Sequence, residues 1–177
     1  MTDDTSGEIP AEIPTKGKAV KKRMLIRKRG EHEEEIDLTK YGARRQARIY
    51  AMQSLFQYDM CEEKPTIEEL TRFDFEQKRI RPTIREFATA LVTGALAELS
   101  VIDPVIVKHS TNWNIERIGY IERAILRFSI YSMFFQPDVP RSVIIDEAIE
   151  IAKVFGGKDT YKFVNGILDG IDRDKRE

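Results

Sequence analysis

Apolar side chains recur every three or four positions through most of the chain after residue 43, which is the spacing of one helix face. The clearest stripes predict helices over residues 44–60, 82–99, 120–135, 143–155 and 160–171. Thr66 and Glu69 have capping-box spacing for a shorter helix, and Asp103–Pro104 resembles the cap and first turn of another. No run alternates apolar and polar residues between turn signals, as a hairpin strand would. The pattern predicts an all-α fold of about six or seven helices.

The predicted helix 120–135 is apolar on nearly every side, so it should be buried at the centre of a C-terminal bundle. Helix 44–60 carries two apolar lines. The second line, Ile49, Met52 and Phe56, lies about 160° or more from the centre of the first. A helix that is apolar on two faces is either buried on both or docks a partner, and the periodicity leaves both interpretations open.

Phe163 lies off the core stripe of the last helix, by about 100°. Asp159, Gly166 and Gly170 share its side, and Lys162 stands next to it. A ring beside a cation on a surface without bulky neighbours suits base stacking with phosphate attraction. The alternative is that Phe163 packs under another segment, as most phenylalanines do.

Arg44, Arg45 and Arg48 cluster at the start of helix 44–60. Cations at a helix N-terminus are unfavourable by about 0.3–1 kcal/mol each, so their placement there requires another explanation. Phosphate binding is one explanation, and a solvated charged helix end is the other.

Residues 1–40 have few apolar positions and no sustained period. Eight basic residues fall between positions 16 and 29, and they are followed by the acidic residues Glu31, Glu33, Glu34, Glu35 and Asp37. Adjacent blocks of opposite charge are typical of disordered segments. The basic block would lie along a phosphate backbone or collapse onto the acidic block. We expect a disordered charged tail over 1–40, a helical domain over 41–174, and a charged C-terminus over 175–177.

Composition limits the function. Lys and Arg number 29 and Asp and Glu 30, a net charge of −1, so nucleic-acid binding would depend on a local patch. A single cysteine, Cys61, excludes an internal disulfide and fits a reducing compartment. The absence of a signal peptide or an apolar run of membrane length predicts a cytoplasmic protein without a membrane anchor.

Nothing in the sequence predicts an enzyme. There is no glycine loop for phosphate and no nucleophile elbow. Two histidines are too few for a metal set, so we expect neither metal nor cofactor. The carboxylates Asp146, Glu147 and Glu150 share a helix face with Lys153, which indicates a solvated surface.

Four blocks of sequence carry a family resemblance. They are RRQAR followed by AMQSLFQ over 44–57, FATALVTGAL over 87–96, ERAILRFSIY over 122–131, and AKVFG with KFVNGILD between 152 and 169. In this order and spacing, the chain from about 41 to 171 resembles the NusB family of bacterial transcription antitermination factors. The resemblance implies two packed helical bundles and an RNA-binding factor that pairs with NusE, a small-subunit ribosomal protein. It also implies binding to single-stranded boxA RNA of ribosomal RNA transcripts within the RNA polymerase antitermination complex.

The resemblance also implies site residues. RNA would be bound by Arg44, Arg45, Arg48, Arg127, Asp159, Lys162 and Phe163. NusE would be held by Ile49, Met52, Phe56 and Glu122. The alternatives are a protein-only interaction module, or an accessory domain of ribosomal RNA processing, without an RNA site of its own. Some relatives dimerise, so a homodimer of the free protein also stays open.

Overall fold

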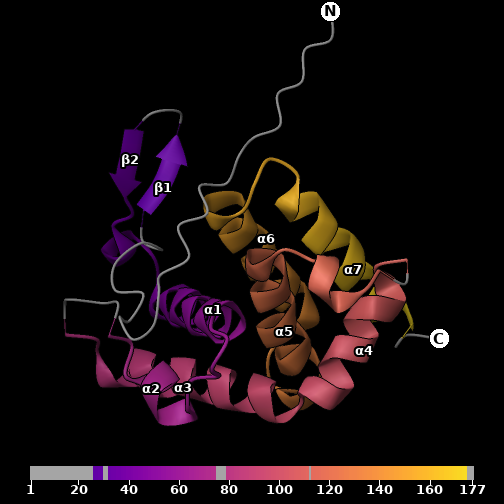
Figure 1. The fold of residues 1–177 in the computed structure, drawn as a ribbon, viewed down its shortest axis with the longest axis horizontal. Coiled ribbons are helices and arrows are strands. Elements are labelled where there is room, and N and C mark those ends of the chain that lie inside the picture. Colours follow the sequence, from indigo (N-terminus) through magenta and orange to yellow (C-terminus); the bar gives the residue numbers. More distant parts are fainter. Residues whose placement is uncertain (1–25, 30–31, 75–78, 112, 175–177) are drawn as a thin grey trace, which may run out of the picture.

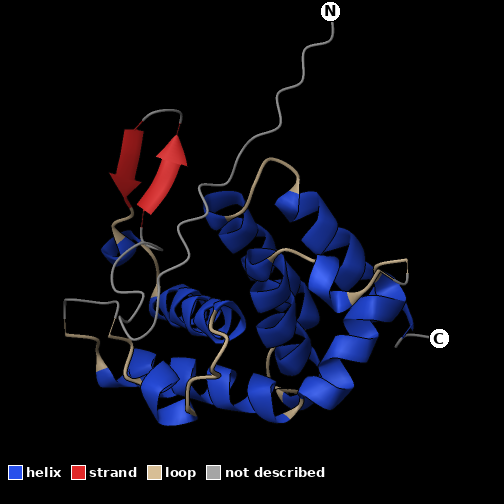
Figure 2. Ribbon diagram, viewed as in Figure 1, coloured by secondary structure: helices blue, strands red, loops and turns tan. Residues whose placement is uncertain are grey.

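The computed structural model describes residues 26–29, 32–74, 79–111 and 113–174. Figures 1 and 2 show a body of packed helices with a small hairpin beside it. In chain order the elements are β1 (Ile26–Arg29), β2 (His32–Glu35), the 3₁₀ helix η1 (Leu38–Lys40), α1 (Ala43–Met60), α2 (Ile67–Thr71), α3 (Pro82–Ala97), α4 (Leu99–His109), the 3₁₀ helix η2 (Ile115–Arg117), α5 (Tyr120–Phe135), α6 (Arg141–Phe155) and α7 (Thr160–Asp174). The predictions for residues 1–25 and 175–177 lie outside the described part.

Helix α5 is the centre of the body, as its apolar sequence predicted. It packs against α1 and α3 on one side and against α4, α6 and α7 on the other. Helices α1, α2 and α3 pack on one another, and α6 packs along α7. The predicted all-α fold is confirmed for this packed body, and α5 joins its two groups of helices.

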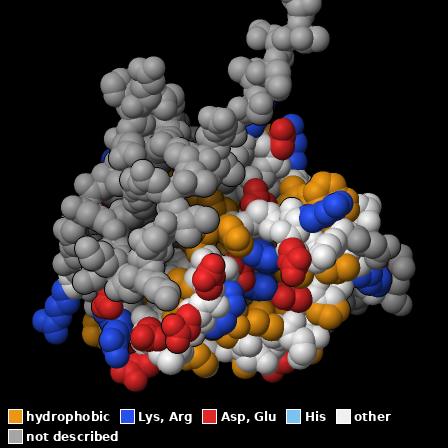
Figure 3. All heavy atoms as spheres, in the orientation of Figure 1, with side chains coloured by type: hydrophobic (Ala, Val, Ile, Leu, Met, Phe, Trp, Pro, Cys, Tyr) orange, Lys and Arg blue, Asp and Glu red, His pale blue; other side chains and the backbone are white. Residues whose placement is uncertain are grey.

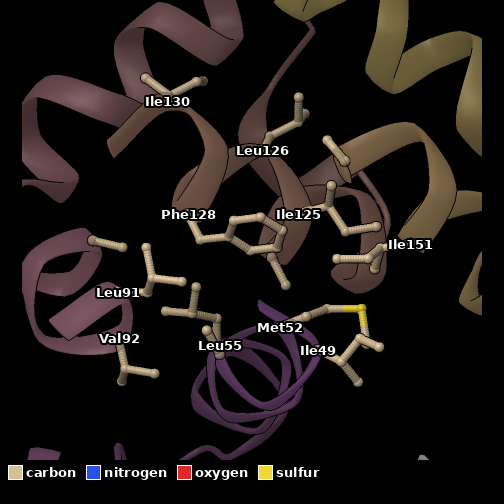
Figure 4. Packing of buried hydrophobic residues seen from close by; sticks show 14 of the residues in the cluster. Ile49, Met52, Leu55, Leu91, Val92, Ile125, Leu126, Phe128, Ile130 and Ile151 are labelled. Atoms are coloured by element: carbon tan, nitrogen blue, oxygen red, sulfur yellow. The ribbon is translucent and has the colours of Figure 1, made fainter. Parts of the chain in front are cut away.

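The second apolar line of α1 is part of the core. Ile49 is 1% exposed and Met52 is 0% exposed. Figure 4 shows both side chains extending from α1 toward Ile125 and Ile151. The expectation that Ile49 and Met52 form a partner surface is therefore wrong for this structure, because both side chains belong to the buried core that α1 shares with α3 and α5.

The hairpin was not predicted. Strands β1 and β2 pair antiparallel, in a register that places Arg27 opposite Glu34 and Lys28 opposite Glu33. The expectation of an unstructured tail through residue 40 does not hold for these strands or for η1.

The packed body also begins earlier than residue 41. The Asp37 carboxylate accepts a hydrogen bond from the Thr39 N–H at 3.0 Å and caps η1. Leu38 follows the cap and is 6% exposed, in contact with the core. The capped helix η1 thus directs the chain toward the core just before α1.

Helix α4 starts at Leu99, so Pro104 lies inside the helix and Asp103 does not cap it. The Asp103 carboxylate instead accepts two hydrogen bonds from Arg127 of α5, at 2.8 Å each. Asp103, which the sequence predicted as a helix cap, therefore forms a contact between α4 and α5 instead.

No single helix in the described residues is long and apolar enough to cross a membrane. Helices α3 and α4 together have the length and composition of a span, but they meet at a bend of 78°.

Met52→Ala tests the assignment of this line to the core. Because the side chain is fully buried, we expect the free energy of unfolding to fall by about 2–5 kcal/mol. Urea unfolding followed by circular dichroism measures the change. Met60→Ala is the matched control, because Met60 lies on the same helix and is 41% exposed. Equal, small losses in the two variants would contradict the assignment.

Candidate functional site

The predicted arginine cluster lies at the start of α1, and its three members differ in their surroundings. Arg44 is exposed, and its guanidinium carbon lies 4.2 Å from the centre of the Phe87 ring of α3. Arg45 is 29% exposed and donates two hydrogen bonds to Glu147 of α6, at 3.0 and 2.7 Å. Arg48 is 4% exposed, with Nη1 3.6 Å from the same carboxylate. Of the three, only Arg44 is exposed.

Glu147 therefore compensates much of the charge of two arginines. Its hydrogen bond and charge raise the pKa of Arg45. Burial lowers the pKa of Arg48, and the attraction of Glu147 offsets this only in part. The sequence did not indicate this role, because Glu147 was assigned to a solvated acidic face. The contact joins residues 102 positions apart, and no local spacing predicts such a pair.

A groove of about 880 Å³ opens beside this cluster. It runs between the start of α1, Phe87 of α3 and the loop that joins α5 to α6. Its lining comprises Gly42, Ala43, Arg44, Arg45, Arg48, Phe87, Phe135, Gln136, Pro137, Asp138, Val139, Val143 and Glu147. Aromatic, aliphatic and charged groups thus line one concave surface.

A second candidate area lies at the start of α7. Lys162 and Asp159 are 64% and 67% exposed and form an ion pair at 2.8 Å. Their hydrogen bond raises the pKa of Lys162 and lowers the pKa of Asp159. Phe163 packs against the core and is half-buried, so part of its ring is exposed. The structure brings Asp159, Lys162 and Phe163 together within one helical turn.

The two glycines beside Phe163 differ. A Cβ on Gly166 would meet nothing within 4 Å, so the surface there is open. A Cβ on Gly170 would lie 2.9 Å from Nδ1 of His109, so Gly170 serves the packing of α7 on α4. Only Gly166 leaves free surface next to the ring.

Arg127 is not at the surface. It is 4% exposed, and its guanidinium is held by Asp103 and by Asp59, with N–O distances of 2.8 Å. Burial lowers the pKa of Arg127, but the hydrogen bonds and charges of the two carboxylates outweigh this and leave the pKa raised. The expectation that Arg127 contacts RNA is wrong in this structure, because its donors are already used by α1 and α4.

Of the residues predicted to hold NusE, Phe56 and Glu122 are partly exposed, and Tyr120 lies beside Phe56. Phe56 is half-buried and lies edge-on to Tyr120, with ring centres 6.0 Å apart. Tyr120 is 44% exposed, and the Arg123 guanidinium lies 5.0 Å from its ring. The Glu122 carboxylate accepts a hydrogen bond from the Thr160 hydroxyl and so ties α5 to α7. Tyr120 begins α5 and was not singled out from the sequence.

Charges of both signs are interspersed on the surface. Outside the grey atoms, Figure 3 shows Lys and Arg side chains among Asp and Glu on the visible face. Within the described residues there is no group of three or more His, Cys, Asp or Glu side chains that could hold a metal ion. Trp113 is 53% exposed.

The packed helices define an all-α binding protein. Its candidate contact areas are small, and they consist of cationic and aromatic side chains that the helix packing brings to the surface. Comparison with known proteins gives the family. The family model described as NusB family matches residues 45–173. This protein belongs to the NusB family.

Its relatives cover the same part of the chain. The transcription antitermination protein NusB of a Nitratiruptor species is 42% identical over 130 residues, which are 73% of this chain and 91% of the relative. The protein of that name from Bacillus pumilus is 40% identical over 134 residues, 76% of this chain and 98% of the relative. The hairpin precedes the residues that the family model matches.

Solved structures agree with the fold. NusB of T. maritima superposes with a TM-score of 0.68 at 34% identity, over 74% of this chain and 91% of that one. A structure of the antitermination factors NusB and NusE in complex with double-stranded RNA gives a TM-score of 0.67 at 28% identity, over 75% and 97% of the two chains.

Asp59→Ala tests the buried ion pairs that fix α1 to α5. The substitution leaves Arg123 and Arg127 without a shared carboxylate 2.8 Å away, so we expect the free energy of unfolding to fall by about 3–5 kcal/mol. Urea unfolding measures the loss. Asp138→Ala is the control, because Asp138 is exposed. A loss for Asp59→Ala no larger than that of the control would contradict a stabilising role for these pairs.

Proposed function

We propose that this protein is an RNA-binding transcription antitermination factor. It pairs with NusE and binds boxA-type single-stranded RNA of ribosomal RNA transcripts in the RNA polymerase antitermination complex. The observation that carries the proposal is the arginine cluster at the start of α1, in a chain that covers 91% of its Nitratiruptor relative. The complex of NusB, NusE and RNA formed by a protein of the same fold supports it.

The RNA surface has two parts. At the start of α1, Arg44 supplies the most exposed charge and Arg45 supplies donors that Glu147 holds in place. At the start of α7, Lys162 adds charge and the exposed part of Phe163 offers a face for a base. Arg48 lies behind the surface, where it supports its neighbours and lines the groove.

The NusE surface lies at the far end of α1. Phe56, Tyr120 and Glu122 come from α1 and the first turn of α5, and they combine aromatic area with a carboxylate. Ile49 and Met52 act behind this surface, in the core. Tyr and other aromatic residues are enriched at protein interfaces because they bury large area at low entropic cost.

A protein-only interaction module, or an accessory domain of ribosomal RNA processing, is the alternative. The net charge of −1 and the use of Glu147 against two arginines favour it. In either case we infer a non-enzymatic protein, without cofactor, that acts in the cytoplasm. A homodimer of the free protein stays a separate proposal.

Fluorescence anisotropy of a labelled boxA-like RNA, titrated with this protein alone and with NusE, tests the proposal. We expect selective binding over a scrambled RNA that is tighter with NusE, since Glu147 already pairs with two of the three arginines in the cluster. Binding through phosphates must weaken steeply as salt rises. Absence of selective binding in both titrations would overturn the RNA role and leave the protein-only module.

Glu147→Gln tests whether this carboxylate limits the charge of the RNA surface. Removing the negative charge releases Arg45, so we expect tighter binding to any single-stranded RNA at low salt. The slope of log affinity against log salt should steepen by about 0.7 for each cation released. Asp146→Asn is the control, because Asp146 is the exposed neighbour on α6. Unchanged slopes in both variants would show that Arg45 does not meet phosphate.

A further inference from the structure

The groove beside the arginine cluster has an apolar part that is open to solvent. Its larger apolar lining residues are Phe87, Phe135, Pro137, Val139 and Val143. Phe135 and Val143 are 42% and 44% exposed. The Phe135 ring stacks on Tyr131, with ring centres 5.4 Å apart, so its position in the groove is restrained. An occupant with apolar side chains would remove this surface from water, which is favourable.

The charged part of the lining has a small positive balance. Three arginines, Arg44, Arg45 and Arg48, face the carboxylates of Asp138 and Glu147 on the same lining. Arg44 is exposed, and its guanidinium carbon lies 4.2 Å from the centre of the Phe87 ring. Cationic and apolar groups thus adjoin. An extended peptide that carries both carboxylates and apolar side chains would complement the two parts together.

The first fifteen residues of this chain have that composition. They contain no lysine or arginine and four acidic residues, Asp3, Asp4, Glu8 and Glu12. The sequence Glu-Ile-Pro occurs twice, at 8–10 and at 12–14. A residue before proline favours extended backbone, and extended proline-containing segments bind grooves lined with aromatic residues.

The hairpin brings this end of the chain within reach of the groove. Ile26 pairs with Glu35, so β1 begins at the end of the hairpin where β2 leaves for η1 and α1 (Figure 1). From Glu35 to Gly42 of the groove the chain advances seven residues, which span at most about 25 Å. The twelve residues from Pro14 to Ile26 span up to about 40 Å, so both Glu-Ile-Pro sequences can reach the groove.

We propose that residues 1–15 bind in this groove of the same molecule and regulate access to the arginine cluster. Ile9 and Ile13 contact the apolar lining, and the acidic side chains face the arginines. Because a tethered segment has an effective concentration of about 1 mM or more, individually weak contacts suffice. The bound segment competes with RNA for Arg44 and Arg45. This competition rests on the proposed function, whereas binding of the segment does not.

A spin label at position 6 tests binding of the segment without any RNA. Ser6→Cys combined with Cys61→Ser gives the full-length chain a single attachment site, because Cys61 is its one cysteine. We expect paramagnetic broadening in NMR spectra to be strongest for amides of the groove, such as those of Phe87 and Val143. The amide of Lys162, on α7, serves as the distant reference and should be little affected.

Val143→Asp places a carboxylate in the groove and should abolish this broadening. Val101→Asp is the matched control, because Val101 is 42% exposed and does not line the groove. Broadening spread evenly over the surface, or unchanged by Val143→Asp, would overturn the proposal. Broadening of groove amides in isotope-labelled protein mixed with separate spin-labelled copies would identify the occupant as a second copy and would overturn binding within one molecule.

Ile9→Ser combined with Ile13→Ser tests the competition in the full-length chain. Groove broadening should disappear, and affinity for the boxA-like RNA should rise about 3- to 10-fold, which corresponds to release of a bound fraction of about 70–90%. Val20→Ser with Met24→Ser is the control, because these apolar residues lie outside residues 1–15. Loss of broadening with unchanged RNA affinity would overturn the competition. The expected broadening in a wild-type protein that binds no RNA selectively would refute the proposed function and leave binding of the segment standing.

Discussion

Ion pairs fix α1 at both of its ends, and the placement of the candidate contacts on α1 depends on them. At its C-terminal end Asp59 lies 2.8 Å from nitrogens of Arg123 and Arg127 of α5. At its N-terminal end Arg45 is held by Glu147 of α6. The two anchors are roughly 21 Å apart along the helix. Between them α1 packs against α3 and α5 and its apolar residues are buried, so the helix has little freedom to rotate about its axis.

The same pairs determine how much charge is left for a ligand. In the buried network two arginines meet two carboxylates, because Asp103 completes the set around Arg127, and this balance offsets the cost of removing the charges from water. At the start of α1 the compensation is incomplete, since one carboxylate serves two arginines. A chain with a net charge of −1 thus keeps a small positive area where three cations gather on one turn.

Periodicity predicted most of the fold, because burial of one helix face is a local property of the sequence. It predicted the central place of α5 and the capping box of α2. It could not choose between the two interpretations of Ile49 and Met52, since a face buried by another helix and a face that docks a partner have the same pattern. It also missed the hairpin, because residues 26–35 do not alternate apolar and polar positions.

The candidate site was predicted less well, for a different physical reason. Arg44, Lys162 and Phe163 were identified from their own helices and lie at least partly exposed. Arg127 and Glu147 were misassigned because their partners are 24 to 102 positions away in the chain, and only the packing of helices brings them together. The family resemblance gave the position of a residue such as Arg127, but it could not show that the hydrogen-bond donors of that residue are already paired with carboxylates of the same chain.

The rigid anchoring of α1 also constrains how a protein partner and an RNA could act together. The arginine cluster and Phe56 lie on the same helix, roughly 18 Å apart. If the two binding events were coupled through a conformational change, the protein would need an element with two alternative arrangements. Each ligand would have to favour the same arrangement. Helix α1 is held at both ends and buried between them, so it is a poor candidate for such an element. A partner docked at Phe56 and Tyr120 would instead strengthen RNA binding by extending the surface with its own cations, which adds phosphate contacts without moving α1.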